Sequence, residues 1–268
     1  MRILFSFFIL IISNKCYNEL GGFMQYLFFI AILPVILLLF FIYKKDYKKE
    51  RKRSLLSSFM LGVVISIPIV IVEIVLEIFL SKNHIMDIFI GVALIEEGFK
   101  WLIVKSKYKK DEFDETYDGI VYAVFVSLGF AAIENILYVC TSSLSTGILR
   151  AITAVPGHAF YAVIMGYYMG KAKQYSIDKN KSKENKLLFI SLLIPTILHG
   201  IYDVLLVDNI LAILVWMVFV ILVTTYSILL VFKASKNNMV YNKKKYCIMC
   251  GTYVENMNYC INCGHKNE

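Results

Sequence analysis

Charged residues are scarce in this chain. They make up 18% of its 268 residues, whereas hydrophobic residues make up 59%. A soluble domain contains roughly a quarter charged residues and about half apolar ones. The shortage of charge therefore excludes an ordinary soluble protein and indicates an integral membrane protein. The fold class that we predict is an all-α polytopic membrane protein with about seven transmembrane helices.

Several familiar signatures are also missing. There is no His-Glu-x-x-His zinc motif, no Gly-x-Ser-x-Gly elbow and no pair of aspartates in a Gly-Asp context, so the intramembrane chemistries built on them are not supported. No internal repeat is visible, although transporters usually contain one. Cys16 and Cys140 stand alone and the four other cysteines are grouped at the C-terminus, so a disulfide framework is not indicated.

What the chain does contain is a series of long apolar runs. Crossing a bilayer takes about 20 apolar residues. The candidate spans cover residues 24–43, 54–80, 85–104, 117–140, 148–170, 187–207 and 210–232. We expect residues 1–23 to be a short apolar leader or the product of a mis-assigned start, because Met24 directly opens the first full-length run. The predicted membrane core is therefore 24–232.

The Lys and Arg residues are concentrated in alternate loops. Segments 44–53, 105–116 and 171–186 hold seven, four and six of them, whereas the intervening loops hold two. This bias predicts that the basic loops and the C-terminal tail are cytoplasmic and that the start of the core lies outside the cell membrane. The net charge of +8 is thus distributed in short clusters between apolar runs. A nucleic-acid partner is not expected.

Ionisable residues interrupt the apolar runs. Each such group at the centre of a membrane helix costs about 2.5–3.5 kcal/mol. With the predicted orientation and a rise of about 1.5 Å per residue, all of them fall between the middle of the bilayer and its outer quarter. We therefore expect one shared polar cavity. The residues are Glu96, Glu97, Lys100, Glu134, His158, His199 and Asp203.

The spacing within the third run brings Glu96, Glu97 and Lys100 onto one helix face, because Lys100 follows them at i+4 and i+3. A purely structural alternative is an internal ion pair that fixes helix packing. That alternative accounts for one carboxylate and leaves the other without compensation. Two adjacent carboxylates can instead poise one of them as an acid/base group near neutrality.

His199 and Asp203 are also at i, i+4, so that Asp203 can orient the imidazole and stabilise its charge. Pro195 precedes His199 by four residues and is expected to bend its helix. Pro156 likewise precedes His158, by two residues, and is expected to act on its helix in the same manner. Broken helices in membranes are tolerated where they line a polar cavity, which favours a functional role for both histidines.

Glu134 could be a ligand, an orienting group or a helix-packing hydrogen bonder. It shares a helix face with Phe130, and Gly129 allows a neighbouring helix to approach closely. Glu73 and Glu77 share a face of the second run near its outer end, where they can reach water, and we interpret them as structural.

Three motifs in order, Glu96-Glu97-x-x-Lys100, Phe130-x-x-x-Glu134 and His199-x-x-x-Asp203, resemble those of the PrsW family. These are membrane proteases that cleave an anti-sigma factor at its extracytoplasmic side, and they belong with the group that contains the CAAX prenyl endopeptidases. The resemblance covers about residues 54–232. It implies hydrolysis of a peptide bond in a single-span membrane protein, with Glu96 or Glu97 activating water and His199 helping to stabilise the oxyanion. It does not decide whether the membrane site holds a metal.

The C-terminal tail contains Cys247-Ile-Met-Cys250-Gly and Cys260-Ile-Asn-Cys263-Gly, two pairs separated by nine residues. Four thiolates at this spacing form a closed tetrahedral zinc site, whose binding energy can fold a short segment. We predict a structural, cytoplasmic zinc ribbon over residues 247–268, joined to the core by the linker 233–246 and available to a protein partner. The alternative is four free cysteines.

Two other functions compete with hydrolysis. Carboxylates and histidines also build proton relays in membrane transporters, but the missing internal repeat argues against a proton-coupled carrier. A membrane receptor without catalysis, whose zinc ribbon recruits a partner, does not explain why four spans would carry polar groups at one depth in the lipid bilayer.

Overall fold

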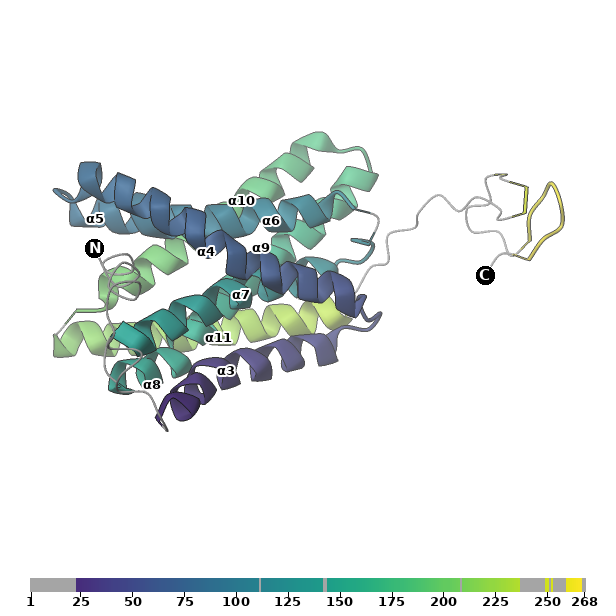
Figure 1. The fold of residues 1–268 in the computed structure, drawn as a ribbon. Helices are drawn as coiled ribbons and strands as arrows, with labels where there is room; N and C mark the ends of the chain where they lie inside the picture. The colour runs from purple at the N-terminus through teal and green to yellow at the C-terminus, as the bar shows by residue number, and fades with distance from the viewer. Residues whose placement is uncertain are drawn as a thin grey trace.

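The computed structural model describes residues 23–110, 112–141, 144–207, 209–236, 249–250, 252 and 259–266. The described core is a bundle of helices (Figure 1), so the predicted all-α polytopic fold is confirmed. Its elements are α3 (Phe23–Lys45), α4 (Lys52–Leu80), α5 (His84–Met86), the π-helix η1 (Asp87–Ala93), α6 (Leu94–Tyr108), α7 (Asp118–Thr141), α8 (Leu144–Ile152), α9 (Ala154–Ile177), α10 (Lys181–Leu205) and α11 (Ile210–Lys236).

All seven predicted spans fall on these helices. Five segments are both long and apolar enough to cross a membrane: α4, α10, α11, residues 118–139 of α7, and Ser145–Ile177 across α8 and α9. The run 24–43 corresponds to α3, and the run 85–104 lies within α5, η1 and α6. The chain is therefore a multi-pass membrane protein. The leader, most of the predicted linker and Cys247 lie outside the described residues.

The two prolines lie at different places in their helices. Pro195 lies inside α10, which runs from Lys181 to Leu205, and the bend expected there stays a prediction. A break occurs at Thr153, between α8 and α9. Pro156 follows in the first turn of α9. N–H groups of the first turn have no partner within the helix, so a residue without an N–H costs no helical hydrogen bond there.

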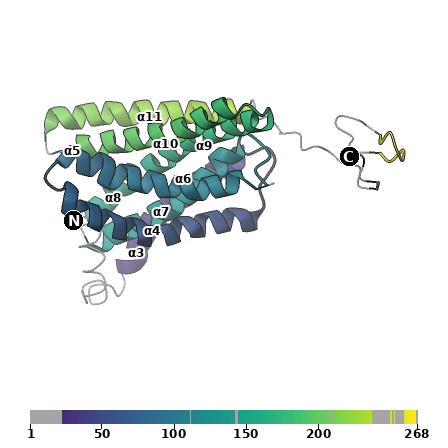
Figure 2. The ribbon, with the colours of Figure 1, turned by 90° about the horizontal axis from the view of Figure 1, so that it is seen from above.

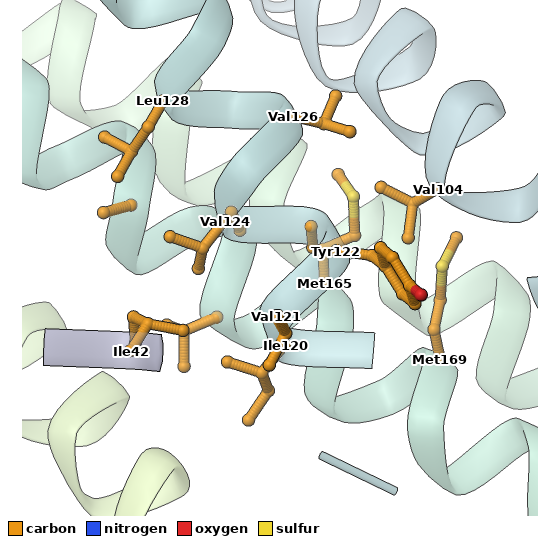
Figure 3. Close-up of a cluster of buried hydrophobic side chains, with 14 of the residues drawn as sticks. Ile42, Val104, Ile120, Val121, Tyr122, Val124, Val126, Leu128, Met165 and Met169 are labelled. Atoms are coloured by element: carbon orange, nitrogen blue, oxygen red, sulfur yellow. The ribbon is translucent and has the colours of Figure 1, made fainter. Parts of the chain in front are cut away.

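Helix α7 occupies the middle of the bundle, between α4 and α9. Most of its side chains are buried, and together with residues of α3, α6 and α9 they form the apolar core that Figure 3 shows. Glycines permit close contact with its neighbours: a Cβ at Gly62 would lie 2.0 Å from the carbonyl oxygen of Val126, and one at Gly166 would lie 2.2 Å from that of Gly119. Small residues let membrane helices approach closely in this way.

The periphery of the bundle is apolar and exposed. Phe40 of α3, Ile78 and Phe79 of α4, and Leu211 and Leu222 of α11 are each more than half exposed. Large exposed apolar surfaces are unusual in soluble monomers. On a membrane protein they are the surface that contacts lipid.

The basic connections gather at one end of the bundle, on the right in Figure 1 and also on the right in Figure 2. Lys48 Nζ lies 2.6 Å from Asp114 Oδ2 and joins the α3–α4 connection to the α6–α7 connection. The Tyr108 hydroxyl donates to Glu184 at 2.9 Å and joins the end of α6 to the start of α10. This grouping agrees with the alternation of the loops, while the assignment of that end to the cytoplasm stays a prediction.

Candidate active site

The polar centre of the bundle begins at the start of α6, directly after the π-helix η1. Glu96, Glu97 and Lys100 are each at most 1% exposed, although all three side chains are ionisable and lie within a membrane bundle. The wider turns of η1 were not predicted; such π-helical turns occur often at functional sites. Phe89 of η1 packs so tightly on α10 that a Cβ at Gly200 would lie 2.4 Å from its ring.

The Lys100 ammonium group connects three acceptors. Its Nζ lies 3.0 Å from Glu96 Oε2, 2.8 Å from Glu97 Oε1 and 3.2 Å from His158 Nδ1. It also lies 4.3 Å from the centre of the Phe130 ring. An ammonium group has three N–H donors and no acceptor, so all three donors are used. Lys100 therefore contacts both carboxylates, as the i+3 and i+4 spacing predicted, although its single charge offsets only one of theirs.

Each histidine lies between the glutamate–lysine group and a second carboxylate. His158 Nδ1 accepts from Lys100, so Nε2 carries the proton and donates to Glu134 Oε2 at 2.8 Å. His199 places Nδ1 3.1 Å from Glu97 Oε1 and Nε2 3.5 Å from Asp203 Oδ2. The two imidazole rings are 5.4 Å apart and perpendicular. The seven residues singled out in the sequence therefore form one connected set of contacts.

Sequence reasoning missed Arg150. Its guanidinium lies 2.8 Å from the second oxygen of Glu134 and 3.6 Å from the centre of the Tyr138 ring. It is one of the two basic residues assigned to the intervening loops, yet it lies within α8 and its side chain is 17% exposed. One signal was available: Arg150 is the only Lys or Arg in residues 111–170, close in sequence to the intramembrane Glu134.

A cavity of about 300 Å³ opens beside this centre, away from the basic connections. Glu96 lines it, together with His158, His199 and Arg150, whereas Glu97 and Lys100 are not among the residues of its wall. Glu73, interpreted above as structural, also lines it, and its Oε1 has no hydrogen-bond partner. The carboxylates around the cavity are Glu73, Glu77, Asp87, Glu96, Glu134 and Asp203.

The residues at the centre fit a divalent metal of the zinc class. Glu96, Glu97, His158 and His199 each offer one ligand atom, and these atoms lie within 4.8 Å of one another. The Oε2 of Glu97 is buried without a hydrogen-bond partner. Two histidines and a glutamate are a common zinc ligand set. Ligating histidines usually also contact a carboxylate through the other ring nitrogen, as both do here.

The family model described as PrsW family intramembrane metalloprotease matches residues 50–229, more than half of the chain. The chain belongs to the PrsW family. Relatives named Protease PrsW include those of Oceanobacillus iheyensis, 47% identical over 44% of this chain and 53% of the relative, and Bacillus subtilis, 47% identical over 43% and 51%. That of Clostridioides difficile is 41% identical over 50% of this chain and 58% of the relative.

This member of the PrsW family thus spans about half the length of the curated relatives it matches. No solved structure matches the chain significantly. The matched residues 50–229 contain the entire polar centre, so the residues of the predicted motifs, together with Arg150, all lie within the region that defines the family.

The cysteines of the tail form a separate cluster. The Sγ atoms of Cys250, Cys260 and Cys263 lie within 4.8 Å of one another, and Cys260 is buried. Hydrogen bonding with Thr252 lowers the pKa of the Cys250 thiol to about 6, which favours the thiolate that binds metals. This three-cysteine cluster could hold a metal ion. The fourth predicted ligand, Cys247, lies outside the described residues.

Proposed function

We propose that this chain is an intramembrane endopeptidase that hydrolyses a peptide bond of a single-span membrane protein near the extracytoplasmic side. The observation that carries the proposal is the connected polar centre: a buried glutamate pair, a lysine and two carboxylate-backed histidines beside a cavity. Membership of a metalloprotease family supports hydrolysis over a proton-coupled carrier or a receptor without catalysis.

Glu96 is the general base in this proposal, because it is the member of the glutamate pair that lines the cavity. It removes a proton from the attacking water as the water oxygen bonds to the carbonyl carbon. The same proton then passes to the amide nitrogen as the C–N bond breaks, leaving a carboxylic acid and an amine. His199, which also lines the cavity, stabilises the oxyanion of the tetrahedral intermediate.

Glu97 and Lys100 do not line the cavity, and they support this chemistry by positioning the residues that do. Lys100 holds both carboxylates in place, and Glu97 holds His199 through its Nδ1. His158, His199 and Glu97 are the residues that would hold a metal, which would take the place of the contacts that Lys100 and Glu97 make with the two Nδ1 atoms. When bound, such a metal supplies a Lewis acid and lowers the pKa of a bound water. Glu134 and Asp203 orient the two imidazoles through the opposite ring nitrogens.

The substrate that we propose is a single-span anti-sigma factor in stress signalling. The cavity lies away from the basic connections and includes His84 and Asp87, close to the turn between α4 and α5. If the basic end is cytoplasmic, as the distribution of Lys and Arg favours, the cavity lies in the outer half of the bilayer. A segment just outside the substrate's span can reach it there.

We also propose that the tail is a zinc ribbon over residues 247–268, which is cytoplasmic and available to a protein partner. Its three clustered thiols support this interpretation. Four thiolates around zinc form a closed shell without room for a substrate. The ribbon is therefore structural, and hydrolysis belongs to the core of residues 24–232.

The test is a cleavage assay on the host's single-span anti-sigma factors, with wild-type protein and the Glu96→Gln variant in parallel. Mass spectrometry of the products locates the cut. We expect one substrate to be cut near its extracytoplasmic juxtamembrane segment by the wild type and not by Glu96→Gln. A cut on the cytoplasmic side, equal cleavage by both proteins, or no cleavage of any candidate by the wild type would contradict the proposal.

A further inference from the structure

A second group of carboxylates lies at the basic end of the bundle, remote from the cavity. Asp46 and Glu50 belong to the α3–α4 connection, Asp114 and Glu115 to the α6–α7 connection, and Asp118 is the first residue of α7. We call these five residues the loop-end carboxylates. Asp118 is fully buried, and Glu115 and Asp46 are 1% and 2% exposed.

Their oxygens converge from three segments of the chain. Asp46, Glu115 and Asp118 each offer an oxygen within 4.8 Å of the others, and so do Glu50, Asp114 and Asp118. Asp118 is common to both sets. The two sets are therefore neighbours around one buried aspartate.

The nearby cations do not balance the charge of Asp46, Glu50, Asp114 and Asp118. Lys48 contacts Asp114, but its side chain is 53% exposed. The Lys49 ammonium donates to the main-chain carbonyls of Tyr43, Lys44 and Asp46. Among the described residues, Lys48 is the only ion-pair partner within 4.0 Å of Asp46, Glu50, Asp114 and Asp118.

An independent feature points to a missing ligand. Asp118 Oδ2 accepts the main-chain N–H groups of Asp114 at 2.8 Å and Glu115 at 2.6 Å, which fixes the carboxylate, while its Oδ1 has no hydrogen-bond partner. The Oδ1 atoms of Asp46 and Asp114 are buried without a hydrogen-bond partner as well. Buried polar atoms without a partner are rare and costly, and three of them belong to this one group of acids.

We propose that the loop-end carboxylates bind a hard divalent cation, Mg²⁺ or Ca²⁺, which ties the α3–α4 connection to the α6–α7 connection. Carboxylate oxygens are the ligands that both ions prefer. The cation supplies the missing partner for Asp118 and Asp46 and offsets the repulsion between the acids. This site is separate from the polar centre and does not depend on the proposed hydrolysis.

The site also fixes the ends of two helices that build the polar centre. α6 carries the glutamate pair and ends just before the loop that holds Asp114 and Glu115, and α7 begins at Asp118. A cation that joins this loop to the α3–α4 connection therefore anchors both helices at one end. We expect its main effect on stability.

The test uses the full-length protein in detergent, stripped of metals with a chelator and titrated with Mg²⁺ or Ca²⁺. Thermal unfolding is followed by intrinsic fluorescence. At roughly 100-fold excess of cation over its Kd, we expect the Tm to rise by about 5 °C or more. The separate titrations identify which of the two ions binds more tightly.

Asp118→Asn and Asp46→Asn should each abolish the rise, while Asp46→Asn should be as stable as the wild type in chelator because it removes a buried charge. Glu112→Gln is the matched control: this acid of the same loop contacts Ser54 and Arg51 and belongs to neither carboxylate set. It should retain the rise.

Binding of radioactive Ca²⁺ to the same proteins measures directly how many ions each chain holds. We expect one ion per chain in the wild type, Glu112→Gln and His199→Ala, and its loss in Asp118→Asn. If Asp118→Asn does not fold, Asp46→Asn carries the test. A wild type that neither binds nor is stabilised by either ion, or a full Tm rise in Asp46→Asn and Asp118→Asn, would overturn the proposal.

Discussion

The two groups of buried carboxylates differ in what balances their charge. In the polar centre, Glu96 and Glu97 share the Lys100 ammonium, and Glu134 lies between His158 and Arg150. Four of the loop-end carboxylates are Asp46, Glu50, Asp114 and Asp118, and one exposed lysine is their only ion-pair partner within the described residues. The protein thus supplies cations to the first group from its own side chains, whereas we propose that the second group takes its cation from solution.

This difference predicts where a single substitution does most harm. Lys100→Met leaves the adjacent carboxylates of Glu96 and Glu97 buried without their cation. Breaking a buried ion pair by removing one partner costs about 3–5 kcal/mol, so we expect the amount of membrane-inserted protein to fall severely. Immunoblotting of membrane fractions measures this. Adding Glu97→Gln to Lys100→Met should restore part of the level, and an unchanged level in the single variant would contradict this reading of the contacts.

The next largest effect should be on cleavage alone. His199→Ala removes the imidazole that is proposed to stabilise the oxyanion, and Glu97→Gln weakens the contact that positions it. Loss of one oxyanion donor typically lowers kcat by about 10²–10³-fold. Cleavage per inserted molecule should fall to this extent in both variants. His84→Ala, which changes a histidine on the same cavity wall, is the control and should stay within a few-fold of the wild type.

A smaller effect is expected from Asp203→Asn. The amide can still accept a hydrogen bond from the imidazole but cannot stabilise its charge. Replacing a carboxylate that supports a ligating histidine usually costs about 10–100-fold, and we expect the lower end because Asp203 lies 3.5 Å from His199 and is partly exposed. Cleavage rates of Asp203→Asn and His199→Ala, measured side by side, check that the first effect is the smaller one. Asp203→Asn as inactive as His199→Ala would show a more direct role.

The smallest effect on cleavage should come from the tail. Cys260→Ser removes the buried thiol of the cysteine cluster. We expect the purified protein to lose one equivalent of zinc by elemental analysis and to keep cleavage within about threefold of the wild type, since the closed thiolate shell is structural. Unchanged zinc content would refute the ribbon.

The elements that sequence alone predicts are those with strong physical signals. The seven spans follow from apolar length, and the residues of the polar centre stand out because ionisable groups in lipid are costly. The π-helix η1 was not predictable, since residues 87–93 have no local feature that selects its wider turn. Arg150 and the loop-end carboxylates were missed because charges between spans look like ordinary solvated loops until the fold buries them.

The central claim is that the polar centre is a hydrolytic site whose base is Glu96, rather than a device for helix packing. Glu96→Gln and Glu73→Gln provide a matched pair, because both acids line the same cavity and only Glu96 contacts Lys100. The decisive measurement is cleavage of a single-span substrate divided by the amount of inserted enzyme. We predict a loss of about 10²–10⁴-fold for Glu96→Gln at normal protein level, with cleavage retained by Glu73→Gln. Full activity of Glu96→Gln, or activity that falls only in step with its protein level, would contradict the account.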